Sequence, residues 1–99
     1  MIYEMRTYTL KPRSVEIVEK IIAEVLPHRL KYSKLIGFWH TDIGPLNQVI
    51  HIWEYKDLAH REQVRAEVSK DPNWPPKIAE YVVSQESKIL APAAFSPIK

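Results

Sequence analysis

The chain has 99 residues, of which 45 % are apolar and 26 % charged, with a net charge of +2 and no cysteine. This length supports one hydrophobic core, so residues 1–99 are expected to form a single domain. The small, scattered positive charge argues against nucleic-acid binding. The absence of cysteine excludes disulfides and fits a cytoplasmic protein. No long apolar run or export leader is recognised, so membrane insertion is not expected.

The first strand and the first helix are predicted from residue type and spacing. The stretch Ile2–Leu10 is rich in β-forming residues. Ser14 then stands where a helix N-cap is favoured, and the apolar residues that follow recur three or four positions apart. They are Val15, Val18, Ile22 and Val25. This spacing predicts a helix to about Lys31, which Pro27 either kinks or divides.

A hairpin and a second helix follow. The β-rich runs 35–41 and 47–55 are separated by a connection that contains Gly44 and Pro45, a pattern typical of a hairpin. Asp57 is a candidate N-cap for a helix over 58–70.

The remaining elements complete a familiar order. Pro75 and Pro76 predict the start of a short third helix that ends near Tyr81. A last strand is predicted over 82–90, and 92–99 forms a C-terminal tail. The order βαββαβ is that of the ferredoxin-like α+β fold, a four-stranded antiparallel sheet with helices on one face.

Two of the predicted strands are apolar on both faces. The runs 36–39 and 49–53 do not alternate as expected for a sheet with one face in water. A second copy of the sheet would cover the other face, so we expect a homodimer formed through the sheet faces. The alternative is that the exposed face tolerates apolar residues, as most protein surfaces do in part.

Charged side chains on the first strand are the first candidates for a site. Glu4 and Arg6 are two residues apart and therefore share a face of the strand. A charge near the core persists only when it is paired or binds something. On the helix over 58–70 the inward stripe contains Arg61, with Leu58, Val64, Arg65 and Val68. We expect Glu4 to face the helices within salt-bridge reach of Arg61, unless Arg61 extends its head into water.

We expect a ligand pocket between the sheet and the helices. Its candidate ligand-binding residues are Glu4, Arg6, Tyr8, Asn47, His51, Trp53 and Arg61. The Gly44-Pro45 loop or the Trp74 segment is expected at its mouth. Arg6 and Arg61 could hold a carboxylate, phosphate or enolate oxygen. His51 is either a base near neutral pH or a hydrogen-bonded core residue, so His51 and Arg6 are the catalytic candidates.

Other kinds of chemistry find little support in the sequence. The histidines fall on separate elements without metal-ligand spacing, so no metal site and no cofactor is expected. There is no glycine-rich phosphate loop, no cysteine nucleophile and no Gly-x-Ser-x-Gly elbow.

Three segments together resemble bacterial members of the NIPSNAP family: IYEMRTY at 2–8, GPLNQVIHIWEY at 44–55 and LAHR at 58–61. The resemblance implies the dimeric α+β barrel architecture, in which two sheets face each other, but little chemistry, because the family lacks a settled activity. It leads to two hypotheses. The chain binds a small apolar or acidic molecule without catalysis, or it is a cofactor-independent monooxygenase or isomerase. In the second case Arg6 or Arg61 stabilises negative charge and His51 moves a proton.

Overall fold

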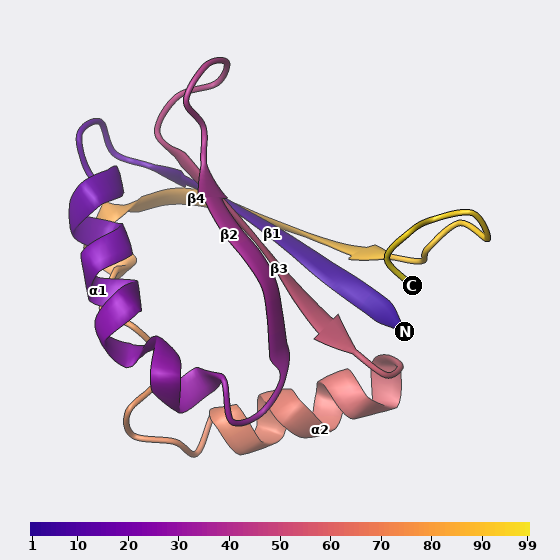
Figure 1. The fold of residues 1–99 in the computed structure, drawn as a ribbon. Helices are drawn as coiled ribbons and strands as arrows, with labels where there is room; N and C mark the ends of the chain where they lie inside the picture. The colour runs from indigo at the N-terminus through magenta and orange to yellow at the C-terminus, as the bar shows by residue number, and fades with distance from the viewer.

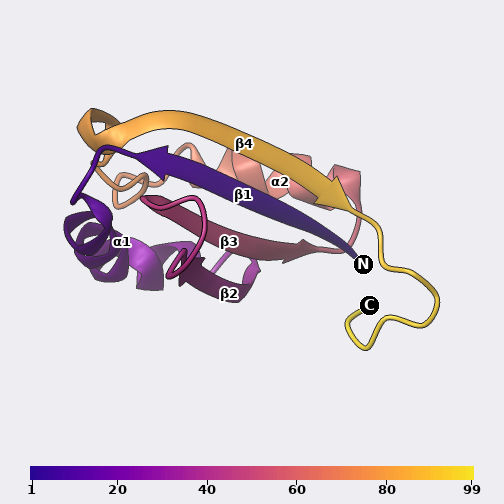
Figure 2. The same cartoon turned by 90° about the horizontal axis from the view of Figure 1, so that it is seen from above.

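The computed structural model describes all 99 residues and confirms the predicted ferredoxin-like α+β fold (Figure 1). Its elements are β1 (Ile2–Leu10), α1 (Val15–Arg29), β2 (Lys34–His40), β3 (Gln48–Tyr55), α2 (Leu58–Val68), a short 3-10 helix η1 (Ala79–Tyr81) and β4 (Val82–Leu90). The four strands form one antiparallel sheet in the order β2-β3-β1-β4. Both helices lie on the same side of this sheet (Figures 1 and 2).

The first strand occupies a central position and pairs with a neighbour on each side. Glu4 is opposite Trp53 of β3 and Ile89 of β4, while Arg6 is opposite His51 and Ser87. Cross-strand partners point to the same face of a sheet. The alternating burial of β3, in which every second residue from Val49 to Tyr55 is buried, identifies that face as the one beneath the helices.

Helix boundaries differ from those predicted at three places, the first of them in α1, which ends at Arg29 rather than near Lys31. The second helix ends at Val68 rather than near residue 70, and the predicted third helix is reduced to the three residues of η1. Pro27 lies within α1, in its last turns, and does not divide it. Asp57 caps α2 as predicted, because its side chain accepts a hydrogen bond from the His60 amide at 2.7 Å. The prediction that Leu58 lies on the inward stripe is wrong, because this residue of the first turn of α2 is 58 % exposed.

The core beneath the helices consists of two apolar clusters. One joins α1 to β1 and β3 and contains Leu10, Val18, Ile22, Val49 and Ile78. The other joins α2 to β3 and contains Trp53, Tyr55 and Val64. The buried polar residues of the sheet, Glu4 and His51, belong to neither cluster. The candidate site is therefore a polar region within the helix-covered face.

Candidate functional site

A cavity of about 590 Å³ lies on the helix-covered face of the sheet. The sheet contributes side chains from all four strands, α1 and α2 contribute two arginines among others, and the segment between α2 and β4 contributes aromatic and apolar residues. The lining of the cavity includes Glu4, Arg6, Tyr8, Arg29, Phe38, His51, Trp53, Arg65, Trp74 and Ile78. Volumes of this size are typical of small-molecule sites, and so is this mixture of apolar walls with a few polar groups.

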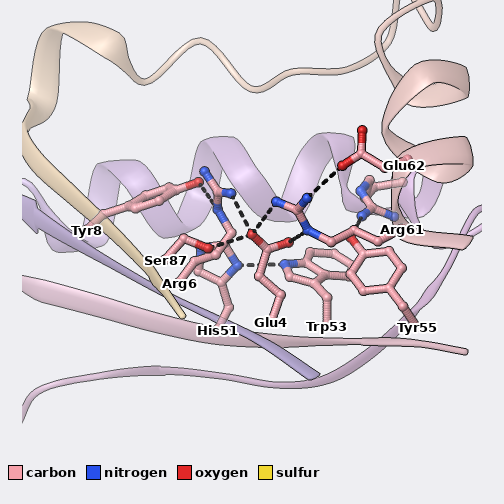
Figure 3. Close-up of polar contacts among 10 residues, drawn as sticks. Glu4, Arg6, Tyr8, His51, Trp53, Tyr55, Arg61, Glu62 and Ser87 are labelled. Carbon is pink, nitrogen blue, oxygen red and sulfur yellow. Dashed lines mark hydrogen bonds and ion pairs between the residues drawn. The ribbon is translucent and has the colours of Figure 1, made fainter. Parts of the chain in front are cut away.

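Glu4 is the only carboxylate that lines the cavity, and it is fully paired (Figure 3). Its side chain is 1 % exposed. Arg61 binds it with two hydrogen bonds, from Nε to Oε1 at 3.1 Å and from Nη2 to Oε2 at 3.0 Å. Arg6 donates from Nη1 to Oε2 at 3.2 Å, and the Ser87 hydroxyl donates to the same oxygen. The prediction that Glu4 faces the helices and pairs with Arg61 is confirmed.

These bonds keep Glu4 ionised. Burial alone would favour its neutral acid, but the hydrogen bonds from Arg61 and Ser87 and the charges of both arginines lower the pKa of Glu4 to about 2. A carboxylate of such low basicity, with each oxygen occupied by a donor, is poorly suited to take a proton from a ligand. Its main effect is to fix Arg6 and to join α2 to the sheet.

His51 forms a buried pair with Trp53 (Figure 3). The indole Nε1–H donates to His51 Nδ1 at 2.7 Å, and the imidazole stacks on Phe38 with ring centroids 5.0 Å apart. Burial and then the charge of Arg6 lower the pKa of His51 to about 4, so the ring is neutral at pH 7. The sequence left open that His51 acts as a base near neutral pH. This geometry does not provide such a base, because the Nδ1 lone pair already accepts the hydrogen bond from Trp53.

Arg29 is the cation that the sequence analysis missed. It ends α1, is 6 % exposed, and has no carboxylate within salt-bridge distance. Its guanidinium donates to the Ser33 hydroxyl at 2.8 Å and the Tyr55 hydroxyl at 2.9 Å, and lies 4.2 Å from the Trp53 ring centroid. Burial lowers the pKa of Arg29 from its ordinary value, and this shift is opposed by Tyr55 and then by the charge of Glu4. A signal for it exists, because Arg29 follows Val25 by four positions and so continues the inward stripe of α1.

The structure brings together most of the expected site residues. Glu4, Arg6, Tyr8, His51 and Trp53 all line the cavity. Arg61 contacts Glu4 from outside the cavity wall and does not line it. Asn47 lies apart, because it precedes β3 with a positive φ of 62° and serves the turn there.

Of the two segments expected at the mouth, only one lies there. Trp74, Pro75 and Pro76 line the cavity, whereas the Gly44-Pro45 loop does not. No group of three or more His, Cys, Asp or Glu side chains is arranged to hold a metal ion. Neither helix has the length and apolar character needed to cross a lipid bilayer.

Comparison with known proteins identifies the family. The NIPSNAP family model matches residues 3–97. This chain belongs to the NIPSNAP family. A solved NIPSNAP domain protein from Burkholderia xenovorans is 40 % identical, with a TM-score of 0.92 over 98 % of this chain and 99 % of that one. The human protein NipSnap homolog 3B is 38 % identical over 73 residues, which are 73 % of this chain and 30 % of the human protein. The matched part of this chain thus spans less than a third of the length of that NIPSNAP relative.

A more distant likeness concerns the fold alone. A putative antibiotic biosynthesis monooxygenase from Nitrosomonas europaea superposes with a TM-score of 0.73 at 10 % identity, covering 93 % of this chain and 98 % of that one. This NIPSNAP protein therefore shares the architecture of that barrel-type fold, and the likeness says nothing of its chemistry.

Proposed function

We propose that this NIPSNAP protein binds a small organic acid with an apolar or aromatic body in the cavity between sheet and helices. One observation carries the proposal: Arg29 is a buried cation beside the cavity without a counter-ion. A buried charge is unfavourable unless it is compensated, and the carboxylate of a ligand would compensate it.

The charge of the whole cavity supports the same ligand. Its lining contains one acid, Glu4, and three arginines, Arg6, Arg29 and Arg65. Glu4 is bonded to Arg6 and Arg61 and forms no salt bridge with Arg29, so its charge acts on Arg29 only at longer range. The aromatic and apolar walls, with Phe38, Trp53 and Trp74, suit the body of such an acid.

Catalysis by proton transfer receives less support from the same residues. A general base works best when its pKa lies near the operating pH, whereas the pKa of Glu4 is about 2 and that of His51 about 4. A cofactor-independent monooxygenase or isomerase therefore remains the alternative, with the cationic cavity holding a ligand oxygen.

The test compares two probes of equal size, phenylacetate and its neutral amide, by the emission of Trp53 and Trp74, both of which line the cavity. We expect the acid to bind and the amide to bind at least about tenfold more weakly, since one charge-assisted hydrogen bond is worth about 1.5–3 kcal/mol. Arg29→Gln should abolish the preference for the acid. Arg13→Gln, at an exposed turn, is the matched control. Equal binding of acid and amide, or no binding of either, would overturn the proposal.

A loss of folding in Arg29→Gln is separated from a loss of binding by a second variant. Arg65 of α2 lines the cavity, is exposed to solvent and forms no salt bridge. Arg65→Gln should weaken binding of the acid while the urea midpoint stays unchanged.

We further propose that the protein is a homodimer formed through the sheet face opposite the helices. That face carries apolar residues on three neighbouring strands, Met5, Trp39, Ile50 and Ile52, and Trp39 is 51 % exposed. A contiguous apolar surface of this kind is typical of a protein–protein interface.

A further inference from the structure

His51 contains the one buried side-chain nitrogen of the molecule that has no hydrogen-bond partner. The residue is 6 % exposed and lines the cavity. Its Nδ1 is bonded to Trp53, whereas Nε2 is buried and unpaired. Buried polar atoms are nearly always paired, so an exception beside a cavity needs an explanation.

The identity of the partner on Nδ1 decides which nitrogen carries the proton. An indole N–H can only donate, so Nδ1 must be the acceptor and must carry no proton. In a neutral imidazole the other nitrogen then carries the hydrogen. The unpaired atom is therefore a donor, Nε2–H, and the group that would satisfy it is an acceptor.

We infer that His51 is a specificity-determining residue of the cavity, donating Nε2–H to a carbonyl or enolate oxygen of the bound acid, and that Trp53 is the positioning residue that fixes this donor. The inference rests on the proposed function and deepens it, because it names the ligand as an acid with a second acceptor oxygen, such as a 2-oxo acid. The arginines hold the carboxylate, and the neutral imidazole distinguishes an acceptor oxygen from a methylene group at the adjacent carbon.

Neighbouring aromatic rings pack against the imidazole of His51 and hold it in place. Phe38 stacks on one face of His51, while Tyr8 meets it edge to face with centroids 4.9 Å apart. Tyr8 is half-buried, and its hydroxyl accepts a hydrogen bond from Arg6 Nε at 3.0 Å. The contacts of Phe38 and Tyr8 therefore fix the orientation of the imidazole ring beside the cavity.

The first measurement is made on the ligand-free protein. Nitrogen NMR of the ¹⁵N-labelled chain assigns the proton of His51 to Nε2 or Nδ1 near pH 7. We expect Nε2–H in the wild type and a mixture of tautomers in Trp53→Phe, which lacks the indole donor. A wild type with its proton on Nδ1 would overturn the inference without any ligand.

The second measurement compares benzoylformate, a 2-oxo acid, with phenylacetate, which has a methylene group in place of the ketone. We expect the wild type to bind benzoylformate at least about tenfold more tightly, with a downfield shift of the His51 Nε2–H proton on binding only this acid. His51→Phe should lose the preference, and His51→Gln should regain part of it through its amide donor. His40→Gln, at a half-exposed histidine bonded to Glu19, should keep it.

The outcomes separate this inference from the proposed function. Equal affinity of the wild type for the two acids overturns the role of His51 and leaves binding of acids intact. If His51→Phe still prefers benzoylformate, the role of His51 is likewise overturned and binding of acids is left intact. If neither acid binds at millimolar concentration, the proposed function fails for this class of ligand and the inference fails with it.

Discussion

Glu4 is the residue on which the polar part of the interior depends. Replacing it by glutamine leaves Arg6 and Arg61 without their shared anion. Both arginines are about one-fifth exposed and can turn toward water, which limits the loss. We expect Glu4→Gln to lower the free energy of unfolding by about 1 to 3 kcal/mol in urea denaturation at pH 7. Binding of acids should remain, because Glu4 does not contact the ligand in the proposed mode.

The matched control for that change is Glu62→Gln. Glu62 also pairs with Arg61, at 3.1 Å, but its side chain is 75 % exposed. Exposed ion pairs contribute little, so the control should change the unfolding free energy by less than about 0.5 kcal/mol. If the two changes lowered the free energy of unfolding equally, the ion pairs of Glu4 would contribute no more than an exposed ion pair.

His51 makes the stability depend on pH in mildly acidic solution. Its pKa falls from 6.5 in the unfolded chain to about 4 in the folded one. Between these two values His51 is protonated in the unfolded chain but not in the folded protein. Its contribution to the free energy of unfolding is therefore complete above pH 6.5 and is lost as the pH falls toward 4. Between pH 7 and pH 5 we expect a loss of about 2 kcal/mol from this group. His51→Gln should remove that slope in urea denaturation.

Two other groups allow this assignment to be checked. Glu4, with a pKa lowered from 4.5 to about 2, loses its contribution to stability only as the pH falls below about 4.5, outside the range from pH 7 to pH 5. The pKa of His40 is raised by its hydrogen bond to Glu19, so protonation there favours the folded state and has the opposite sign. His40→Gln should leave the acid-side loss in place or steepen it. A slope that persists unchanged in His51→Gln would mean that another group titrates there.

The sequence predicted which side chains share a face wherever a strand was long and its two-residue alternation was clear. Two-residue spacing is enough to place Glu4 with Arg6, and His51 with Trp53, on common faces. It does not reveal that the indole donates to the imidazole, because that depends on side-chain rotamers. Arg29 was hidden because it follows Pro27, where a helix is expected to weaken, although α1 continues through the proline.

At the scale of elements, β2 contains a local irregularity that shapes the open face of the sheet. The pairing of β2 with β3 shifts register between Leu35 and Gly37. The Trp39 indole then lies across Gly37 so closely that a Cβ at position 37 would be 2.3 Å from the ring. Because the ring is half exposed, it can swing away rather than strain the strand.

We therefore expect Gly37→Ala to displace the Trp39 ring with little loss of stability in the monomer, below about 1 kcal/mol. In the wild type the Hα protons of residue 37 should carry a ring-current shift from the indole, and in the variant that NMR shift should vanish. Retention of the shift would mean that the strand has moved instead of the ring.

Element order and the first and last strands were predictable because β-forming runs and helical spacing are separated by Pro, Gly and Asp. The structure of the short segment between α2 and β4 could not be predicted in the same way. It has no periodic pattern, and its proline-rich stretch reads as the start of a helix, whereas in the structure Trp74 to Pro76 form part of the cavity wall. A wall of this kind is defined only by contacts between distant segments.

At the scale of the whole molecule, the open sheet face predicts self-association. A sheet-to-sheet interface of the obligate type buries roughly 2,000 Å² or more. Ile52 lies near the middle of this face, between Met5 and Gly37 on the neighbouring strands. We expect sedimentation equilibrium to show a dimer at micromolar concentration, and Ile52→Lys to give a monomer.

Leu58→Lys is the control, because Leu58 is an equally apolar and more exposed residue on the helix side. It should leave the dimer unchanged. A folded wild-type monomer at micromolar concentration would exclude this interface, and so would a dimer that survives Ile52→Lys.

The central place of β1 in the sheet also bears on how the protein is made. Tyr3 of β1 pairs with Glu54 of β3 on one side and with Leu90 of β4 on the other. The first strand therefore needs partners from the middle and the far end of the domain. Pairings between such distant segments slow folding. During synthesis β1 can pair with β3 once residue 55 has left the ribosome, but its other edge stays unpaired until β4 has emerged, and the charged side chains Glu4 and Arg6 lie on that open edge strand.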